Sequence, residues 1–196
     1  MMDRKTQITQ IERVRELWSG ASLIARREIR DQLRDWRILV PILLLTLFFP
    51  VLMNFTANSL VSFVEKYNAP LIGDRLIPFL LMIVGFFPIS ISLVIALESF
   101  VGEKERLTIE PLLCTPLSDP QIFLGKLWAS LFLPLSASYL GILVYLGGIW
   151  TLLGWRAPLS FLVLIFVLTT VQGLVMVSGA VVISTHTTSV RAANLL

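Results

Sequence analysis

Few side chains in this sequence are placed to do chemistry. The pair Gly125-Lys126 has the spacing that ends a phosphate-binding loop, but Leu127 stands where that loop needs Ser or Thr, and Pro120 stands where it needs its first Gly. Because this loop is what cradles the phosphates of a nucleotide, the sequence predicts no ATP-hydrolysing site on this chain.

The histidine and the cysteine are each single. His186 has no Cys, Asp or Glu within ten residues, so no metal site is predicted. Ser178-Gly179 with His186 could suggest an intramembrane serine protease, yet Met176 stands where such a motif needs Gly, and His186 follows the end of the last apolar run. Cys114 excludes an intrachain disulfide, and we expect it to be an inert, packed free thiol. No catalytic residue is predicted.

Charged side chains gather in residues 98–126, which we call the polar segment. Uncharged apolar runs flank it on both sides. Ionised groups are strongly disfavoured in hydrocarbon, so the polar segment must lie in water. Its charged residues are Glu98, Glu103, Lys104, Glu105, Arg106, Glu110, Asp119 and Lys126.

Four long windows contain no Asp, Glu, Lys or Arg. A helix needs about 20 apolar residues to cross the bilayer, and each window is long enough. Their continuous apolar character excludes the alternating pattern of a membrane β-barrel. The sequence therefore predicts an all-α membrane protein with at least four transmembrane helices. The windows are Ile38–Val64, Leu76–Leu97, Leu127–Trp155 and Ala157–Val190.

The distribution of Lys and Arg predicts the orientation. Nine Lys or Arg residues lie in residues 1–37, three lie in the polar segment and one lies in the tail. The remaining three lie on the other side of the predicted spans, two of them in residues 65–75 and the third at Arg156. The positive-inside rule then places the N-terminus, the polar segment and the tail in the cytoplasm of a multi-pass plasma (inner) membrane protein. The net charge of +3 reflects this topology, and no nucleic-acid motif accompanies it.

Residues 1–37 are predicted to form an amphipathic elbow helix that lies in the headgroup layer and runs into the first span. An apolar stripe at Ala25, Ile29 and Leu33 faces lipid while arginines on other faces meet anionic phosphate. A solvated helix packed on another protein is the alternative. The predicted headgroup contacts are Arg26, Arg27, Arg30, Arg34 and Trp36.

Local signals predict a compact structure within the polar segment. Pro111 breaks any helix that continues from the second span, so a short second helix is expected from Thr108, ending at Pro116. Ser118 and Gln121 have the spacing of a capping box that starts the third helix. An ordinary solvated loop is the alternative. Three small residues, Ala137, Gly141 and Gly179, are predicted at helix–helix interfaces.

The run from Glu103 to Pro116, followed by Gly125-Lys126, resembles the cytoplasmic signature of ABC-2 type transporter permeases. The layout of the chain is also similar to that family, with a basic elbow helix and two spans before the signature and two spans after it. Leu107 and Ile109 depart slightly from the family pattern. Members usually have six spans, so the resemblance implies that this chain is an N-terminal fragment and that further spans follow its tail.

The resemblance implies a permease subunit of an ATP-driven exporter. It would dimerise, as a homodimer or heterodimer, and bind a separate ABC ATPase subunit that carries ATP and Mg²⁺, so that no cofactor is bound by this chain. A short cytoplasmic coupling helix between spans 2 and 3 would contact the ATPase. The coupling role carries over to Glu103, Glu105, Arg106, Glu110, Leu112, Leu113 and Pro116.

The expected organisation follows from these interpretations. Two other functions stay open: a non-transporting membrane scaffold and a polytopic membrane enzyme. The transported substrate cannot be read from the sequence. The expected parts are the interfacial helix 1–37, two spans in 38–97 around an external loop at 65–75, the coupling segment 98–126, two spans in 127–183, and a cytoplasmic turn at 184–196.

Overall fold

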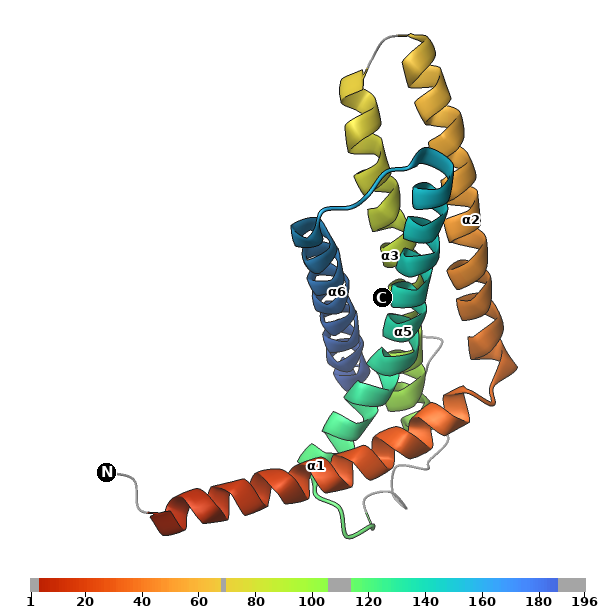
Figure 1. Ribbon diagram of the computed structural model, residues 1–196. Helices are drawn as coiled ribbons and strands as arrows, with labels where there is room; N and C mark the ends of the chain where they lie inside the picture. Colours follow the sequence, from red (N-terminus) through yellow and green to blue (C-terminus); the bar gives the residue numbers. More distant parts are fainter. Residues whose placement is uncertain (1–3, 68–69, 106–113, 187–196) are drawn as a thin grey trace. The chain divides into compact units, whose positions relative to one another are not determined.

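The regular secondary structure of the described part of the chain consists of helices joined by turns and short connections (Figure 1). The computed structural model describes residues 4–67, 70–105 and 114–186, with side chains at 15–64, 66–67, 76–102, 105 and 114–184. Among these residues there are helices and no strand, which confirms the predicted all-α class with an N-terminal helix, whereas the predicted coupling helix falls mostly outside the described residues. The helices are α1 (Arg4–Gln32), α2 (Trp36–Lys66), α3 (Pro70–Glu105), α5 (Asp119–Leu153) and α6 (Leu159–His186).

Four of these helices are long and apolar enough to cross a membrane, as predicted. The helix α3 and, by two residues at each end, α2 extend beyond both ends of their charge-free windows, and α5 begins before its window, because polar end turns continue the same backbone. For example, α3 has 36 residues, which at about 1.5 Å per residue is roughly 54 Å and exceeds a hydrocarbon core of about 30 Å. The candidate spans are Trp36–Val64, Leu76–Gly102, Asp119–Leu153 and Leu159–Ser184.

A short turn separates α1 from α2. The amide of Leu33 still donates to the carbonyl of Ile29 (2.9 Å), whereas the amides of Arg34 and Asp35 bond only three residues back, to Asp31 and Gln32. Trp36 is therefore the first residue of α2, where the sequence placed it at the end of an uninterrupted elbow helix.

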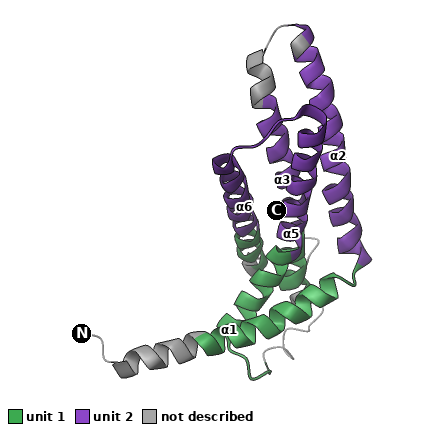
Figure 2. Ribbon diagram, viewed as in Figure 1, with its two compact units in different colours: residues 1–35, 93–132, 177–196 green, residues 36–92, 133–176 purple. Residues whose placement is uncertain are grey.

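The described chain divides into two compact units (Figure 2), and α3, α5 and α6 each contribute residues to both. Unit 1 contains residues 1–35, 93–132 and 177–196, and unit 2 contains residues 36–92 and 133–176. The core of unit 1 gathers side chains from α3, α5 and α6. Its buried members are Ala96, Leu97, Val101, Leu131, Val177 and Ala180.

The core of unit 2 is built from side chains of α2, α3, α5 and α6. Gly141 of α5 is buried, and its Cβ position lies 3.5 Å from Val84 of α3 and 3.6 Å from Pro50 of α2. A residue without a side chain lets three helices approach closely, as is typical of packing in membranes. The buried apolar side chains are Ala57, Ile77, Leu80, Leu81, Val84, Ile142, Tyr145, Ile149 and Ile165.

Polar side chains in unit 2 bond between helices. The Ser138 hydroxyl of α5 donates to the Gly85 carbonyl of α3 (3.0 Å). The Tyr139 hydroxyl lies 2.6 Å from the Thr170 hydroxyl of α6. Because the Thr170 hydroxyl itself donates to the Phe166 carbonyl (2.7 Å), Tyr139 is the donor in this pair. These bonds connect α5 to α3 and to α6 without using an ionised group.

Candidate functional site

Most residues predicted to couple to an ATPase lie outside the described residues: Arg106, Glu110, Leu112 and Leu113, together with the expected break at Thr108. Glu103 lies within α3, and its side chain is outside the description too. The two that the structure places fully are Glu105, the exposed last residue of α3, and Pro116, which lies before α5. Their coupling role stays a prediction.

Cys114 lies in the same stretch, and its side chain is exposed. The expectation of an inert, packed thiol is therefore wrong. The sequence preference of free Cys for protein interiors did not apply here, because the residue falls between two helices in a polar stretch rather than on a packed helix face.

The start of α5 has the predicted capping geometry. The Ser118 amide donates to the Gln121 side-chain oxygen (2.8 Å), and the Gln121 amide donates to the Ser118 carbonyl (2.9 Å). This is the reciprocal half of a capping box, which satisfies a backbone donor that the helix itself cannot pair. The other end of the same side chain donates from Nε2 to the Glu16 carbonyl of α1 (2.9 Å). Gln121 therefore both starts α5 and connects it to α1.

α1 packs closely against the first turns of α5. At Gly125, the Cβ position lies 2.7 Å from the Ile24 Cβ and 2.8 Å from the Ala21 carbonyl oxygen. At Gly20, the Cβ position lies 2.6 Å from the Gln121 side chain. Real Cβ atoms do not fit at such distances. At Gly125 the neighbours are a Cβ and a backbone oxygen, so glycine is required there for the two helices to lie this close, whereas at Gly20 the neighbour is the flexible end of the Gln121 side chain, which can turn away.

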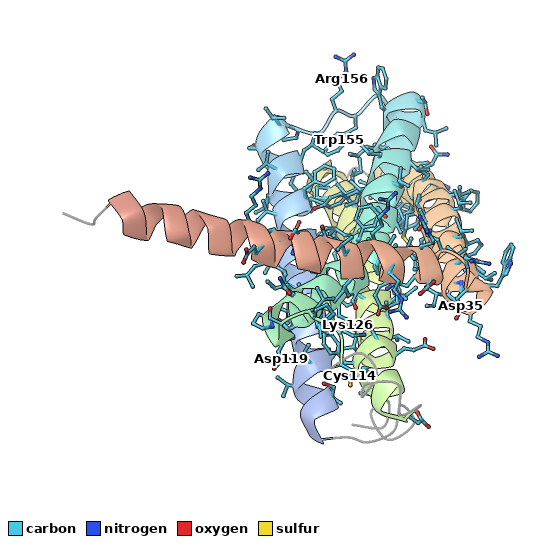
Figure 3. The ribbon with its side chains drawn as sticks, turned by 90° about the horizontal axis from the view of Figure 1, so that it is seen from below. Asp35, Cys114, Asp119, Lys126, Trp155 and Arg156 are labelled. Carbon is cyan, nitrogen blue, oxygen red and sulfur yellow. The ribbon has the colours of Figure 1, made fainter. Side chains whose placement is uncertain are left out.

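A buried ion pair lies beside this contact. The Lys126 side chain is only 5% exposed, and its Nζ donates to Glu28 Oε1 at 3.1 Å. The same Nζ donates to the carbonyl of Ser99 (3.1 Å) and lies 3.3 Å from the Ser99 hydroxyl. Lys126 thus links α5 to both α1 and α3 (Figure 3). We call Gly20, Ala21, Ile24 and Glu28 the docking face of α1.

Removing one partner of a buried ion pair leaves the other charge without compensation. This loss is about 3–5 kcal/mol for fully buried pairs. The Glu28 side chain keeps 22% of its exposure, so water screens part of the unpaired charge and the lower end of that range applies. Lys126 therefore contributes to the position of α1 as well as to stability.

The predicted headgroup residues lie away from the docking face. Trp36 is 71% exposed, and the side chains of the arginines reach the surface. Arg27 lies 3.9 Å from Asp31, at exposed sites where an ion pair contributes little. This leaves the guanidinium groups accessible to an anionic surface, and their contact with lipid stays a prediction. The four arginines are Arg26, Arg27, Arg30 and Arg34.

The predicted interface residues have different surroundings. Ala137 is 6% exposed, and Gly141 lies between α2 and α3. Around the Cβ position of Gly179, no heavy atom of the described residues lies within 4 Å. The structure thus brings the two α5 residues into contacts and leaves Gly179 beside open space.

A metal centre finds no support in the part of the chain that the structure describes, where no three His, Cys, Asp or Glu side chains gather. Lys126, whose spacing from Gly125 resembles the end of a phosphate loop, has its Nζ directed at Glu28 and Ser99. The arrangement is suited to holding the three helices together.

A comparison with known families identifies the family of this chain. A model of the ABC-2 family transporter proteins matches residues 22–196. The chain belongs to the ABC-2 transporter family. No curated protein matches it. This ABC-2 protein is accordingly a multi-pass membrane permease, and the match includes the docking face from Ile24 onward, the polar segment and all four spans.

Sequence reasoning missed the docking face of this ABC-2 protein. In the sequence, Glu28 is only one of the acids among the arginines, and nothing singles out Ser99. The available signal was the pair of small residues Gly20-Ala21 on α1, together with Gly125-Lys126 at the first turns of α5. Small residues on two amphipathic or apolar helices favour close approach, but a sequence does not say which helices meet.

Proposed function

We propose that this ABC-2 permease works as the membrane-spanning subunit of an ATP-driven exporter, moving substrate across the plasma membrane when coupled to a separate ATPase subunit. The observation that carries the proposal is the anchoring of the polar segment. Its first residues belong to α3, which ends at Glu105, and its last residues belong to α5, which starts at the Ser118–Gln121 cap. Within the polar segment, Lys126 of α5 binds Ser99 of α3.

A stiff connection is what coupling requires. A soluble ATPase can change the tilt of membrane helices only by pushing on an element that does not yield. A capped helix start and a buried ion pair supply that stiffness at the α5 end. In the sequence, the residues predicted to contact the ATPase run from Glu103, in the last turn of α3, to Pro116, before the start of α5.

The ATP and Mg²⁺ belong to the partner in this proposal. Lys126 is buried and bonded to Glu28 and Ser99, which supports the inference from sequence that Gly125-Lys126 is no phosphate loop. In the same proposal, the N-terminus and the polar segment face the cytoplasm, α1 contacts headgroups through its arginines, and two permease subunits form a homodimer or heterodimer. The parts of the chain keep the roles expected from the sequence: interfacial helix (1–37), first pair of spans (38–97), coupling segment (98–126), second pair of spans (127–183) and cytoplasmic turn (184–196).

The experiment is copurification of the ATPase subunit with the tagged permease, followed by measurement of ATP turnover in lipid nanodiscs. Two variants test the contact: Glu110→Lys, and Asp in place of both Leu112 and Leu113. Each should reduce the amount of ATPase subunit recovered and uncouple its ATP turnover from transport by the permease. Glu65→Lys is the matched control, because it reverses a charge in the loop predicted to lie on the opposite side of the membrane.

The control variant should recover as much ATPase as the wild type. If the polar-segment variants also recover normal amounts and leave ATP turnover unchanged, the coupling proposal is wrong and a non-transporting scaffold becomes the better account. A polytopic membrane enzyme would need ionisable groups at the membrane faces of the spans, and the four charge-free windows contain no Asp, Glu, Lys or Arg.

A further inference from the structure

Three helices of unit 1 meet at the Lys126 ammonium group. Glu28 belongs to α1, Ser99 to α3, and Lys126 itself to α5, with Nζ–oxygen distances of 3.1 Å to Glu28 and to the Ser99 carbonyl. The Lys126 side chain is 5% exposed. An ammonium group has three N–H donors, and here they are directed at two elements far apart in the sequence.

α1 is attached to α5 at two separate points. The Gln121 side chain binds the Glu16 carbonyl, and Lys126 binds the Glu28 carboxylate. Glu16 and Glu28 are twelve residues apart on α1, which is about 18 Å along the helix axis at about 1.5 Å per residue. A rod held at two points this far apart cannot pivot about either one independently.

The close contact at Gly125 alone would not fix the orientation of α1 relative to α5. Dispersion contacts weaken steeply over a fraction of an ångström, and they have no preferred angle around the helix axis. A charge-assisted hydrogen bond adds direction, because it is lost when the donor and acceptor separate or turn. Lys126 therefore fixes which way α1 points, while Gly125 fixes how close it lies.

We infer that Lys126 is a positioning residue that makes α1 move together with the ends of α3 and α5 that belong to the polar segment. A displacement of the polar segment then reaches α1, an amphipathic helix outside the four spans, as well as the spans themselves. That the ATPase subunit causes this displacement rests on the proposed function. The attachment of α1 to α3 and α5 does not depend on it.

The test measures the distance between α1 and α5 with spin labels. Cys114→Ser removes the native thiol, and labels are placed at Asp31 and Asp119, which are both exposed. In the wild-type complex with its ATPase subunit, in lipid nanodiscs, one narrow distance distribution is expected without nucleotide. The same distribution is expected with Mg-ATP, because the two helices move together.

Lys126→Met should broaden the distribution and change permease-dependent ATP turnover by at least about fivefold, the lower end for a coupling free energy between sites. Lys126→Arg keeps a cation within reach of Glu28 and should restore both readouts. Glu28→Gln, which keeps the shape of the side chain and removes its charge, provides a second variant should Lys126→Met fail to fold. It should broaden the distribution as well.

Two results would overturn the inference: a wild-type distance that changes when Mg-ATP binds, or Lys126→Met and Glu28→Gln distributions as narrow as the wild type. Broadened distributions with unchanged ATP turnover would overturn the transmission of movement to α1. Failure of the wild-type permease to recover any ATPase would refute the proposed function instead. The nucleotide-free distances would then still decide whether Lys126 fixes α1.

Discussion

The substitution Gly125→Ala tests the contact between α1 and α5 directly. The added Cβ would lie 2.7 Å from the Ile24 Cβ and 2.8 Å from the Ala21 carbonyl oxygen. Neither is the tip of a flexible side chain, so no rotamer change relieves the clash. A carbon–carbon contact is relaxed near about 3.7 Å, so α1 must retreat by about 1 Å from its present 2.7 Å approach.

Overpacking of this kind is destabilising by about 1–3 kcal/mol. A shift of about 2–4 °C in Tm per kcal/mol is usual for domains of 150–250 residues, so Gly125→Ala should lower Tm by roughly 2–12 °C relative to its control. A retreat of about 1 Å also stretches the Lys126–Glu28 bond from 3.1 Å to about 4 Å, beyond hydrogen-bond range.

Gly147→Ala is the matched control. Gly147 lies in the same helix, α5, and no described heavy atom lies within 4 Å of its Cβ position. Both substitutions share the gain of about 1 kcal/mol that Ala has over Gly in a helix, so their difference isolates the clash. Thermal unfolding of both variants in the same detergent measures it. Equal Tm values for Gly125→Ala and Gly147→Ala would refute the close approach of α1.

Three further predictions address other contacts. Tyr139→Phe removes the hydroxyl that donates to Thr170 at 2.6 Å, and by denaturant unfolding it should lose about 0.6–1.7 kcal/mol; an equal loss in a Thr170→Val background would contradict this pairing. Gly148→Ala should lower Tm because its Cβ would overlap the Asn54 side-chain amide, and Asn54→Ala should restore it; no rescue in the double variant would argue against that overlap. The exposed Cys114 should react with a membrane-impermeant maleimide in inverted vesicles and not in intact cells; labelling of intact cells would reverse the proposed topology.

The spans could be predicted from sequence because burial in lipid leaves a simple signature. Charged groups are excluded from hydrocarbon over about 20 residues, and no knowledge of neighbours is needed to see that. The start of α5 was equally accessible, since Ser118 and Gln121 interact within a single turn. Local and solvent-imposed features were therefore within reach.

The docking face of α1 was not within reach, because it does not look apolar. Its members include Gly20 and Glu28, which contribute little or nothing to a hydrophobic stripe. The stripe that the sequence did show continues to Leu33, which is 48% exposed, and to Trp36 in the next helix. Only the position of Gly125 and Lys126 in space reveals why a glycine and a glutamate face inward.

The Tyr139–Thr170 pair was missed for a related reason. Each side chain lies in an apolar run where a hydroxyl can bond to its own backbone, as Thr170 also does with Phe166. Nothing in the spacing along the chain says that the two hydroxyls meet across α5 and α6. Long-range partners of this kind depend on helix rotation and crossing, which the sequence specifies only through the whole packed core.

The contact between Glu28 and Lys126 has a consequence for synthesis in the cell. The two residues are 98 positions apart in the chain, so at about 5–20 residues per second a ribosome needs roughly 5–20 s to make the lysine after the glutamate. Throughout that interval α1 exists without the helix it finally packs against. In its proposed role as an interfacial helix, the basic, amphipathic α1 would lie on the bilayer surface until α5 emerges.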